Sequence, residues 1–190
     1  MKTYLFFDIE SCGLLEHEHH EMVQLASLLA NEEAEEMASM SMIIKPVGWT
    51  IPGSATNIHG ITTAYAERVG VPTIVALKTF LMHCMIADYV IAHNIEFDAE
   101  IIRQELYKVG LGKAIKSFDS IPKYCTMREL TEFCQLPKRG RGRGYKWPKL
   151  GELFKCALNE DMEDAHTAHS DVFALKTIFY ELKGRGIINI

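Results

Sequence analysis

The 190-residue chain is long enough to bury a continuous core, and we expect a single domain over residues 1–190. Its apolar content of 48% and charged content of 24% are ordinary for a globular protein and exclude a disordered chain. The net charge of −5 excludes a protein that coats nucleic acid through bulk positive charge. It leaves open an enzyme that holds a short strand end with a few local basic residues.

The sequence also bears on location. No run of roughly 18 apolar residues is present, so no membrane span is expected. The start, MKTYLFFDIE, has a short apolar run that meets acids at once, unlike a secretory signal peptide. The five cysteines form no C-x-x-C pair and are odd in number, which favours free thiols over disulfides or a zinc site. We therefore expect a cytoplasmic protein.

The first part of the chain predicts a small sheet. Residues 3–9 are apolar on both faces, which is typical of a central strand in a covered sheet. Residues 22–30 and 37–45 follow, separated by an acidic turn, so the three segments predict an antiparallel meander. Residues 46–60 are expected to be irregular, and residues 61–70 to hold a short helix.

Helices and strands alternate in the rest of the chain. The apolar spacing and the turn signals, such as Gly110, place their boundaries. In chain order, we expect a helix over 72–86, a strand over 88–93, and helices over 95–110, 126–134, 148–157 and 164–183. Strands followed by alternating helix and strand indicate an α/β fold, with a mixed sheet flanked by helices.

Four carboxylates occupy positions where a charge is costly. Asp8 and Glu10 lie two residues apart on the predicted central strand, so their side chains leave the same face. Asp98 lies in the apolar stripe of its helix, and Asp171 is in line with the inward residues of the last helix, well inside it. Buried acids of this kind need a cation or a hydrogen-bond network to stay ionised.

Each acid also has an ordinary explanation. The strand end at Asp8 and Glu10 could fray into solvent, and Asp98 could be a first-turn acid that complements the helix dipole. A buried salt bridge could account for Asp171. His166, about 140° from Asp171 around a helix, is expected at the helix start or on the preceding loop, where a lone histidine is usually a capping or surface residue.

Together the acids indicate a metal site. Four carboxylates from three separate elements, with a histidine nearby, offer the hard oxygen ligands that Mg²⁺ or Mn²⁺ prefers, not those of zinc.

Four segments resemble motifs of one family. DIESCGL (8–14), AHNIEFD (92–98) and HTAHSD (166–171) resemble the D-x-E-x-x-G-L, H-N-x-x-F-D and H-x4-D motifs of DnaQ-like exonucleases. IHGIT (58–62) matches a further segment between the first two. The branch is DEDDh, which includes the proofreading epsilon subunit of bacterial DNA polymerase III. The motifs come in family order and span nearly the whole chain.

The resemblance implies a fold and an activity. The fold would be RNase H-like, with a five-stranded mixed sheet and helices on both faces. The activity would be a 3′→5′ exonuclease that releases 5′-mononucleotides, with single-stranded DNA as the expected substrate and a DNA polymerase as a further expected partner. Carried over by position, two Mg²⁺ or Mn²⁺ ions would be held by Asp8, Glu10, Asp98 and Asp171, with His166 as general base. The pocket for the terminal nucleotide would be lined by Gly13, Leu14, Ile58, His59 and Phe97.

A basic, glycine-rich loop at about 137–149 departs from the epsilon subunit and is more similar to exonucleases of phage or prophage type. No acid lies between Lys138 and Lys149, and Tyr145 and Trp147 lie among the basic residues. Such segments are suited to contact the phosphate backbone of a nucleic-acid strand and to stack on its bases, although a solvated charged loop is the alternative. The residues expected to contact nucleic acid are Lys138, Arg139, Arg141, Arg143 and Lys146.

Two other functions stay open at this point. One is an RNA exonuclease similar to oligoribonuclease, because the motifs do not report on contacts to a 2′-OH. The other is a non-catalytic polymerase-accessory module that keeps the fold, which the presence of every expected ligand disfavours.

Overall fold

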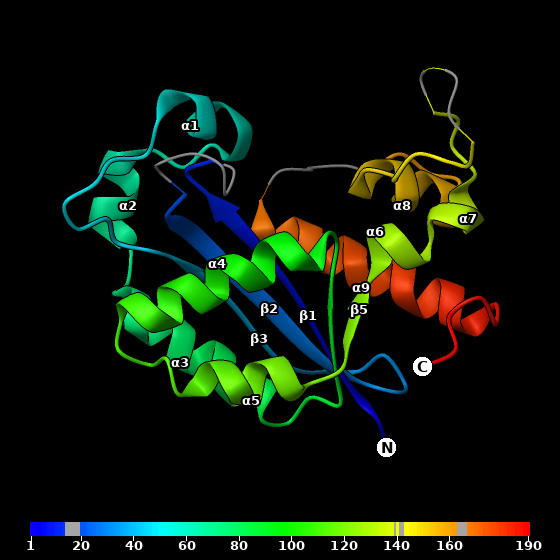
Figure 1. Cartoon of the computed structure of the whole chain (residues 1–190), viewed down its shortest axis with the longest axis horizontal. Helices are drawn as coiled ribbons and strands as arrows, with labels where there is room; N and C mark the ends of the chain where they lie inside the picture. The colour runs from blue at the N-terminus through cyan, green and yellow to red at the C-terminus, as the bar shows by residue number, and fades with distance from the viewer. Residues whose placement is uncertain (14–19, 139, 141–142, 163–166) are drawn as a thin grey trace.

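A five-stranded mixed sheet with the order β3-β2-β1-β4-β5 forms the centre of the protein (Figure 1). The computed structural model describes residues 1–13, 20–138, 140, 143–162 and 167–190. The strands are β1 Thr3–Ser11, β2 Met22–Asn31, β3 Glu36–Ile43, β4 Tyr89–Ala92 and β5 Lys123–Cys125.

The central strand is β1, as its apolar pattern predicts. Residues Tyr4 to Phe7 are 0% exposed, because both faces of β1 are covered. β1 pairs with β2 antiparallel and with β4 parallel, and β2 pairs with β3 antiparallel. The predicted meander is therefore confirmed.

Helices cover both faces of the sheet (Figure 1). They are α1 Gly53–His59, α2 Thr63–Val69, α3 Thr73–Cys84, α4 Ile95–Lys108, α5 Ala114–Ser120, α6 Thr126–Glu129, α7 Thr131–Cys134, α8 Leu150–Leu158 and α9 Ala168–Gly184. Leu5 and Phe7 face one core with α3, α4 and α5, whereas Tyr4 and Phe6 face another with α8 and α9. In the described part of the chain, no helix is both long and apolar enough to cross a membrane.

Three local predictions were wrong or incomplete. The segment expected to be irregular contains α1, which follows Pro52 and ends where Gly60 adopts φ 75°. Only Ala55 and His59 of α1 are buried, so no apolar stripe marks it. The helix expected over 126–134 is two short helices, because the backbone departs from helical geometry at Leu130. The sequence pattern predicted no helix over the residues of α5 and no strand over those of β5, which is too short to show a pattern.

Candidate active site

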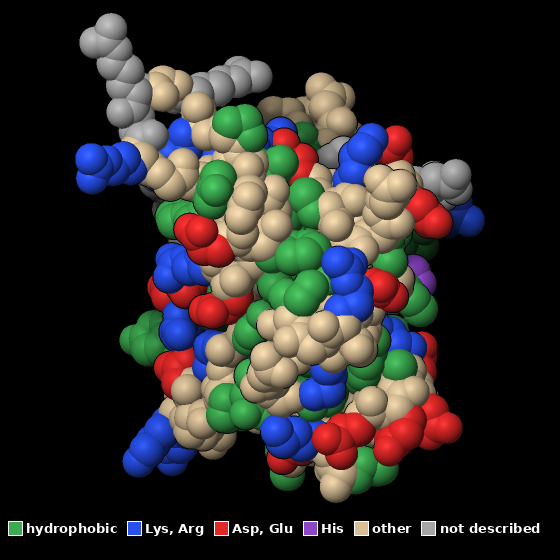
Figure 2. Space-filling model, turned by 90° about the vertical axis from the view of Figure 1, so that its right-hand side faces the viewer, with side chains coloured by type: hydrophobic (Ala, Val, Ile, Leu, Met, Phe, Trp, Pro, Cys, Tyr) green, Lys and Arg blue, Asp and Glu red, His purple; other side chains and the backbone are tan. Residues whose placement is uncertain are grey.

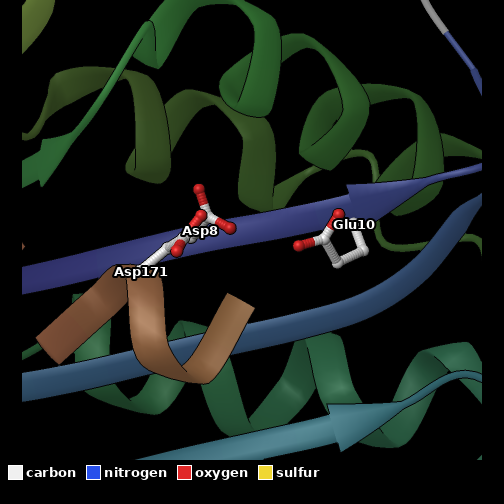
Figure 3. Close-up of side chains that lie close together, drawn as sticks. All are labelled: Asp8, Glu10 and Asp171. Atoms are coloured by element: carbon white, nitrogen blue, oxygen red, sulfur yellow. The ribbon is translucent and has the colours of Figure 1, made fainter. Parts of the chain in front are cut away.

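Three acidic side chains meet at one point of the structure. One carboxylate oxygen each from Asp8, Glu10 and Asp171 lies within 4.8 Å of the others (Figure 3). Asp8 and Glu10 come from β1, and Asp171 comes from the first turn of α9. The sequence pattern predicted these acids one by one, and the fold brings them together.

The packing of α9 on β1 explains this meeting. Phe6 contacts Phe179 with ring centroids 5.4 Å apart, which fixes α9 against the even-numbered face of β1. Asp8 follows Phe6 by two residues on that face, and Asp171 lies two turns of helix before Phe179. The same contacts that bury the aromatic core therefore bring both carboxylates to the end of β1.

Asp171 is nearer the start of its helix than the sequence indicates. α9 begins at Ala168 instead of residue 164, because the Thr167 side chain caps it by accepting a hydrogen bond from the backbone N–H of Ser170 at 3.2 Å. The expectation that Asp171 lies well inside the helix is thus wrong. In the first turn, the positive end of the helix dipole favours its negative charge.

Asp98 is the most buried of the four acids. It lies in the first turn of α4 with 3% of its surface exposed, beside the fully covered Ile101 and Ile102. Its carboxylate accepts a hydrogen bond from the backbone of Ile9 on β1. This bond ties the helix acid to the strand that carries the other ligands, and the predicted apolar-stripe position is confirmed.

Burial and mutual repulsion raise the pKa values of these acids. The pKa of Asp8 is raised well above its usual value, first by burial and then by the charges of the other three acids. Burial, and then Asp171, raise the pKa of Glu10 to about 7. Burial also raises the pKa of Asp98, although its hydrogen bond with Ile9 opposes the rise. Added positive charge at this point would relieve the repulsion.

The donor chemistry fits a divalent cation. The convergent atoms are all carboxylate oxygens, the ligands that hard cations such as Mg²⁺ and Mn²⁺ prefer. Asp98 is not part of the group within 4.8 Å, but its charge interacts with Asp8 and Glu10. The arrangement could hold one divalent ion directly, with Asp98 at its margin.

The expected nucleotide-lining residues have different surroundings. His59 is 5% exposed, and its Nδ1 accepts a hydrogen bond from the backbone N–H of Ile61 at 3.1 Å. The proton of the neutral ring is therefore on Nε2, which has no hydrogen-bond partner within the described ranges. Ile58 is 63% exposed at the end of α1, and Phe97 packs against the core under α4. Gly13 is half-buried, and its carbonyl accepts a hydrogen bond from the Ser11 hydroxyl.

α1 is attached to the end of the strand that carries the site. Its Ala55 packs in a small buried cluster with Cys12, which follows β1, and with Ile61. Figure 1 shows α1 next to the tip of β1. Leu14 and His166, predicted to line the pocket and to act as general base, lie outside the described residues.

The base of the basic loop is a short hairpin. Pro137 pairs with Tyr145, and Lys146 donates its backbone N–H to Leu136. Lys138 and Arg143 are exposed, whereas Lys146 forms an ion pair with Glu152 at 2.5 Å. Arg139 and Arg141 lie outside the described residues. Of the five residues expected to contact nucleic acid, Lys138 and Arg143 are therefore the exposed ones among the described residues, and Nζ of Lys138 donates a hydrogen bond to the carbonyl of Arg143 at 3.1 Å.

His93 and Arg128 are two residues whose roles the sequence did not single out. His93 contacts Thr126 Oγ1 at 3.0 Å and the carbonyl of Pro148 at 2.9 Å. Arg128 forms an ion pair with Glu96 at 2.9 Å. The presence of His93 in the segment AHNIEFD was the only available signal, and it did not reveal a contact 55 residues away.

Comparisons with known proteins point to one family. A family model described as Exonuclease (RNase T) matches residues 5–179. A DNA polymerase III subunit epsilon-like protein of Rhodobacter capsulatus is 26% identical over 190 residues, which are 97% of this chain and 25% of that protein. The 3′-5′ exonuclease DinG of Bacillus subtilis is 26% identical over 181 residues, 95% of this chain and 18% of that protein. Three-prime repair exonuclease 1 of Bos taurus is 23% identical over 202 residues, which cover 94% of this chain and 62% of that protein.

This chain thus spans between about a fifth and three fifths of these relatives. Among solved structures, E. coli exonuclease I in complex with a dA16 oligonucleotide has a TM-score of 0.78 at 19% identity, over 97% of this chain and 41% of that one. The zinc-bound form of the E. coli exonuclease I–ssDNA complex has a TM-score of 0.79 at 20% identity, with the same coverage of both chains. At this identity the likeness concerns the fold, and the expected RNase H-like sheet is confirmed.

Proposed function

Because this chain belongs to the exonuclease family, we propose that it is a metal-dependent 3′→5′ exonuclease that releases 5′-mononucleotides from single-stranded DNA. One observation supports this most: the meeting of Asp8, Glu10 and Asp171 within 4.8 Å at the end of the central strand. Such a group of acids destabilises the folded chain by itself, and a function in holding cations explains why the chain tolerates it.

Two divalent ions, Mg²⁺ or Mn²⁺, would be held by these three acids together with Asp98. When bound, they would supply positive charge to the scissile phosphate and to the attacking water. Asp98 would be the most rigid of the ligands, since its carboxylate is already oriented by the backbone of Ile9. Asp171 is placed by the capped start of α9.

The proton of the attacking water would pass to His166, which has the position of the general base in the third motif. An imidazole with an ordinary pKa of about 6.5 accepts a proton near neutral pH. In the sequence, His166 comes two positions before Ala168, the first residue of α9.

The terminal nucleotide would lie between α1 and the end of β1. The buried Nε2–H of His59 offers a donor to a phosphate or sugar oxygen, and the exposed Ile58 beside it offers an apolar contact. Gly13 and Phe97 complete the described part of this pocket, and Leu14 would join them. Lys138 and Arg143 would contact the strand backbone, as would Arg139, Arg141 and, after release from Glu152, Lys146.

The test is release of nucleotides from a 5′-labelled single-stranded DNA, with a matched RNA strand alongside. We expect a ladder shortened from the 3′ end, loss of activity in EDTA and recovery with Mn²⁺. Asp171→Asn should abolish activity, while Asp161→Asn, at a carboxylate exposed by 83%, should not. Full activity of Asp171→Asn with unchanged metal dependence would refute the ligand assignment, and faster digestion of the RNA would identify an RNA exonuclease.

Association with a DNA polymerase is a further part of the proposal. It is supported by similarity to a protein described as epsilon-like. Co-purification with a polymerase catalytic subunit would support it, and separate elution of the two at micromolar concentrations would count against it.

A further inference from the structure

An aromatic side chain is exposed at the base of the basic loop, with a cation against it. Trp147 is 60% exposed, and the guanidinium carbon of Arg128 lies 5.7 Å from the centroid of its ring. Arg128 is itself half exposed and is held by its ion pair with Glu96. Single exposed apolar residues are common at protein surfaces, so what distinguishes Trp147 is the guanidinium that lies against its ring.

The backbone that carries Trp147 is anchored. The next residue, Pro148, is buried, and its carbonyl oxygen accepts a hydrogen bond from Nε2 of His93. Since Nε2 carries the proton, Nδ1 of the neutral ring accepts from the hydroxyl of Thr126. Burial lowers the pKa of His93, which keeps the ring neutral and this pattern of donors intact. The exposed ring therefore sits at a fixed position on the surface.

That position lies at the same edge of the sheet as the acids. His93 directly follows β4, and Thr126 directly follows β5. Both strands run parallel to β1, so their ends lie at the edge where β1 presents Glu10. Glu96, the partner of Arg128, precedes Asp98 by two residues on α4. Figure 1 shows α6, α7 and α8 grouped beside this edge, on the side away from α1. Figure 2 shows one face of the molecule, on which Lys and Arg side chains lie among acidic and apolar ones.

We propose that Trp147 and Arg128 form a stacking subsite for an unpaired base upstream of the 3′-terminal nucleotide. This rests on the proposed function, which places the terminal nucleotide near α1, so that the strand continues across the acids toward α6 and α8. The ring of Trp147 stacks on the face of a base, and the guanidinium of Arg128 holds the adjoining phosphate. A base inside a duplex has no free face, so the subsite selects single strands.

Fluorescence of Trp147 gives a direct test. The chain has two tryptophans, so Trp49→Phe leaves Trp147 as the sole reporter. With Asp171→Asn and EDTA present to prevent cleavage, the variant is titrated with deoxyoligonucleotides of increasing length. We expect quenching by longer strands, none by a mononucleotide, and little by a blunt duplex of the same length.

Affinity measurements separate stacking from charge. In the same uncleaving background, Trp147→Ala should weaken binding of a long single strand about 10-fold, the amount that one stacked base contributes. It should leave mononucleotide binding unchanged, and Trp147→Phe should recover most of the loss. Arg128→Lys should keep the salt dependence but bind the strand more weakly than the unaltered protein.

Equal binding of Trp147→Ala and the unaltered protein at every length would overturn the subsite, as would equal loss for mononucleotides and long strands. Thermal unfolding of each variant checks that the fold is intact. We expect an intact fold, because the side chains of Trp147 and Arg128 are exposed. These measurements need no hydrolysis. Quenching without any nucleotide release by the unaltered protein would refute the exonuclease activity but not the subsite. Nucleotide release without quenching would refute the subsite but not the exonuclease activity.

Discussion

Removing one charge from the acidic cluster should stabilise the metal-free protein. Glu10 can be changed to Gln, which keeps the shape of the side chain and removes its ability to ionise. In the folded chain, burial and the charge of Asp171 raise the pKa of Glu10 from 4.5 to about 7. At about 1.4 kcal/mol per pKa unit, ionising Glu10 above pH 7 costs about 3 kcal/mol. Screening at this half-buried group reduces the expected gain to about 2 kcal/mol.

The direction of the pH dependence follows from the same shift. Between pH 4.5 and about 7 the folded chain holds a proton on Glu10 that the unfolded chain has released. The folded state binds more protons in this window, so its free energy of unfolding falls as the pH rises. The advantage of Glu10→Gln should therefore be small at pH 5 and fully present at pH 8.

Thermal unfolding in EDTA measures the effect. At pH 8, Glu10→Gln should raise the Tm by about 4–8 °C for a chain of this size. Glu67→Gln makes the same change at an exposed position and should alter stability by less than about 0.5 kcal/mol. Excess Mn²⁺ should reverse the order, because the unaltered protein gains more from binding. If Glu10→Gln and Glu67→Gln behave alike in EDTA at pH 8, burial and repulsion at Glu10 do not destabilise the metal-free protein.

Three further outcomes are expected. His166→Ala should keep metal binding, measured by calorimetry, but lower the rate at least about 10²-fold, and near-normal turnover would remove His166 from the mechanism. Changing both Lys138 and Arg143 to Gln should raise KM and reduce the slope of log KM against log salt by about 1.4, at about 0.7 per phosphate contact, while an unchanged slope would mean no phosphate contact. Gly70→Ala should lower stability by about 2 kcal/mol or more in urea unfolding, since its Cβ would lie 2.4 Å from the carbonyl oxygen of Ala66; an unchanged midpoint would contradict this.

Local pattern was enough to identify the central strand and the acids. Residues 3–9 are mostly apolar on both faces, and a strand covered on both faces fits that pattern. Asp8 and Glu10 interrupt it at one end, and Asp98 and Asp171 interrupt two helical stripes. A charge in an apolar pattern is visible in the sequence because it opposes the burial that the pattern predicts.

Short elements and helix ends could not be found in the same way. β5 has three residues, and α1 buries only two, so neither repeats a period long enough to detect. The start of α9 depends on the cap between Thr167 and Ser170, in which each side chain accepts a hydrogen bond from the backbone N–H of the other residue. This cap places Asp171 in the first turn.

The sequence by itself determined which residues are chemically out of place: acids in apolar stripes, basic residues without acids, and an order of motifs that fits one family. Only the tertiary structure decided that Asp8, Glu10 and Asp171 share one point and that His93 holds the base of the basic loop. The reason is physical. Periodicity reports which face of an element is buried, but contacts between elements far apart in the chain depend on how their cores pack against one another.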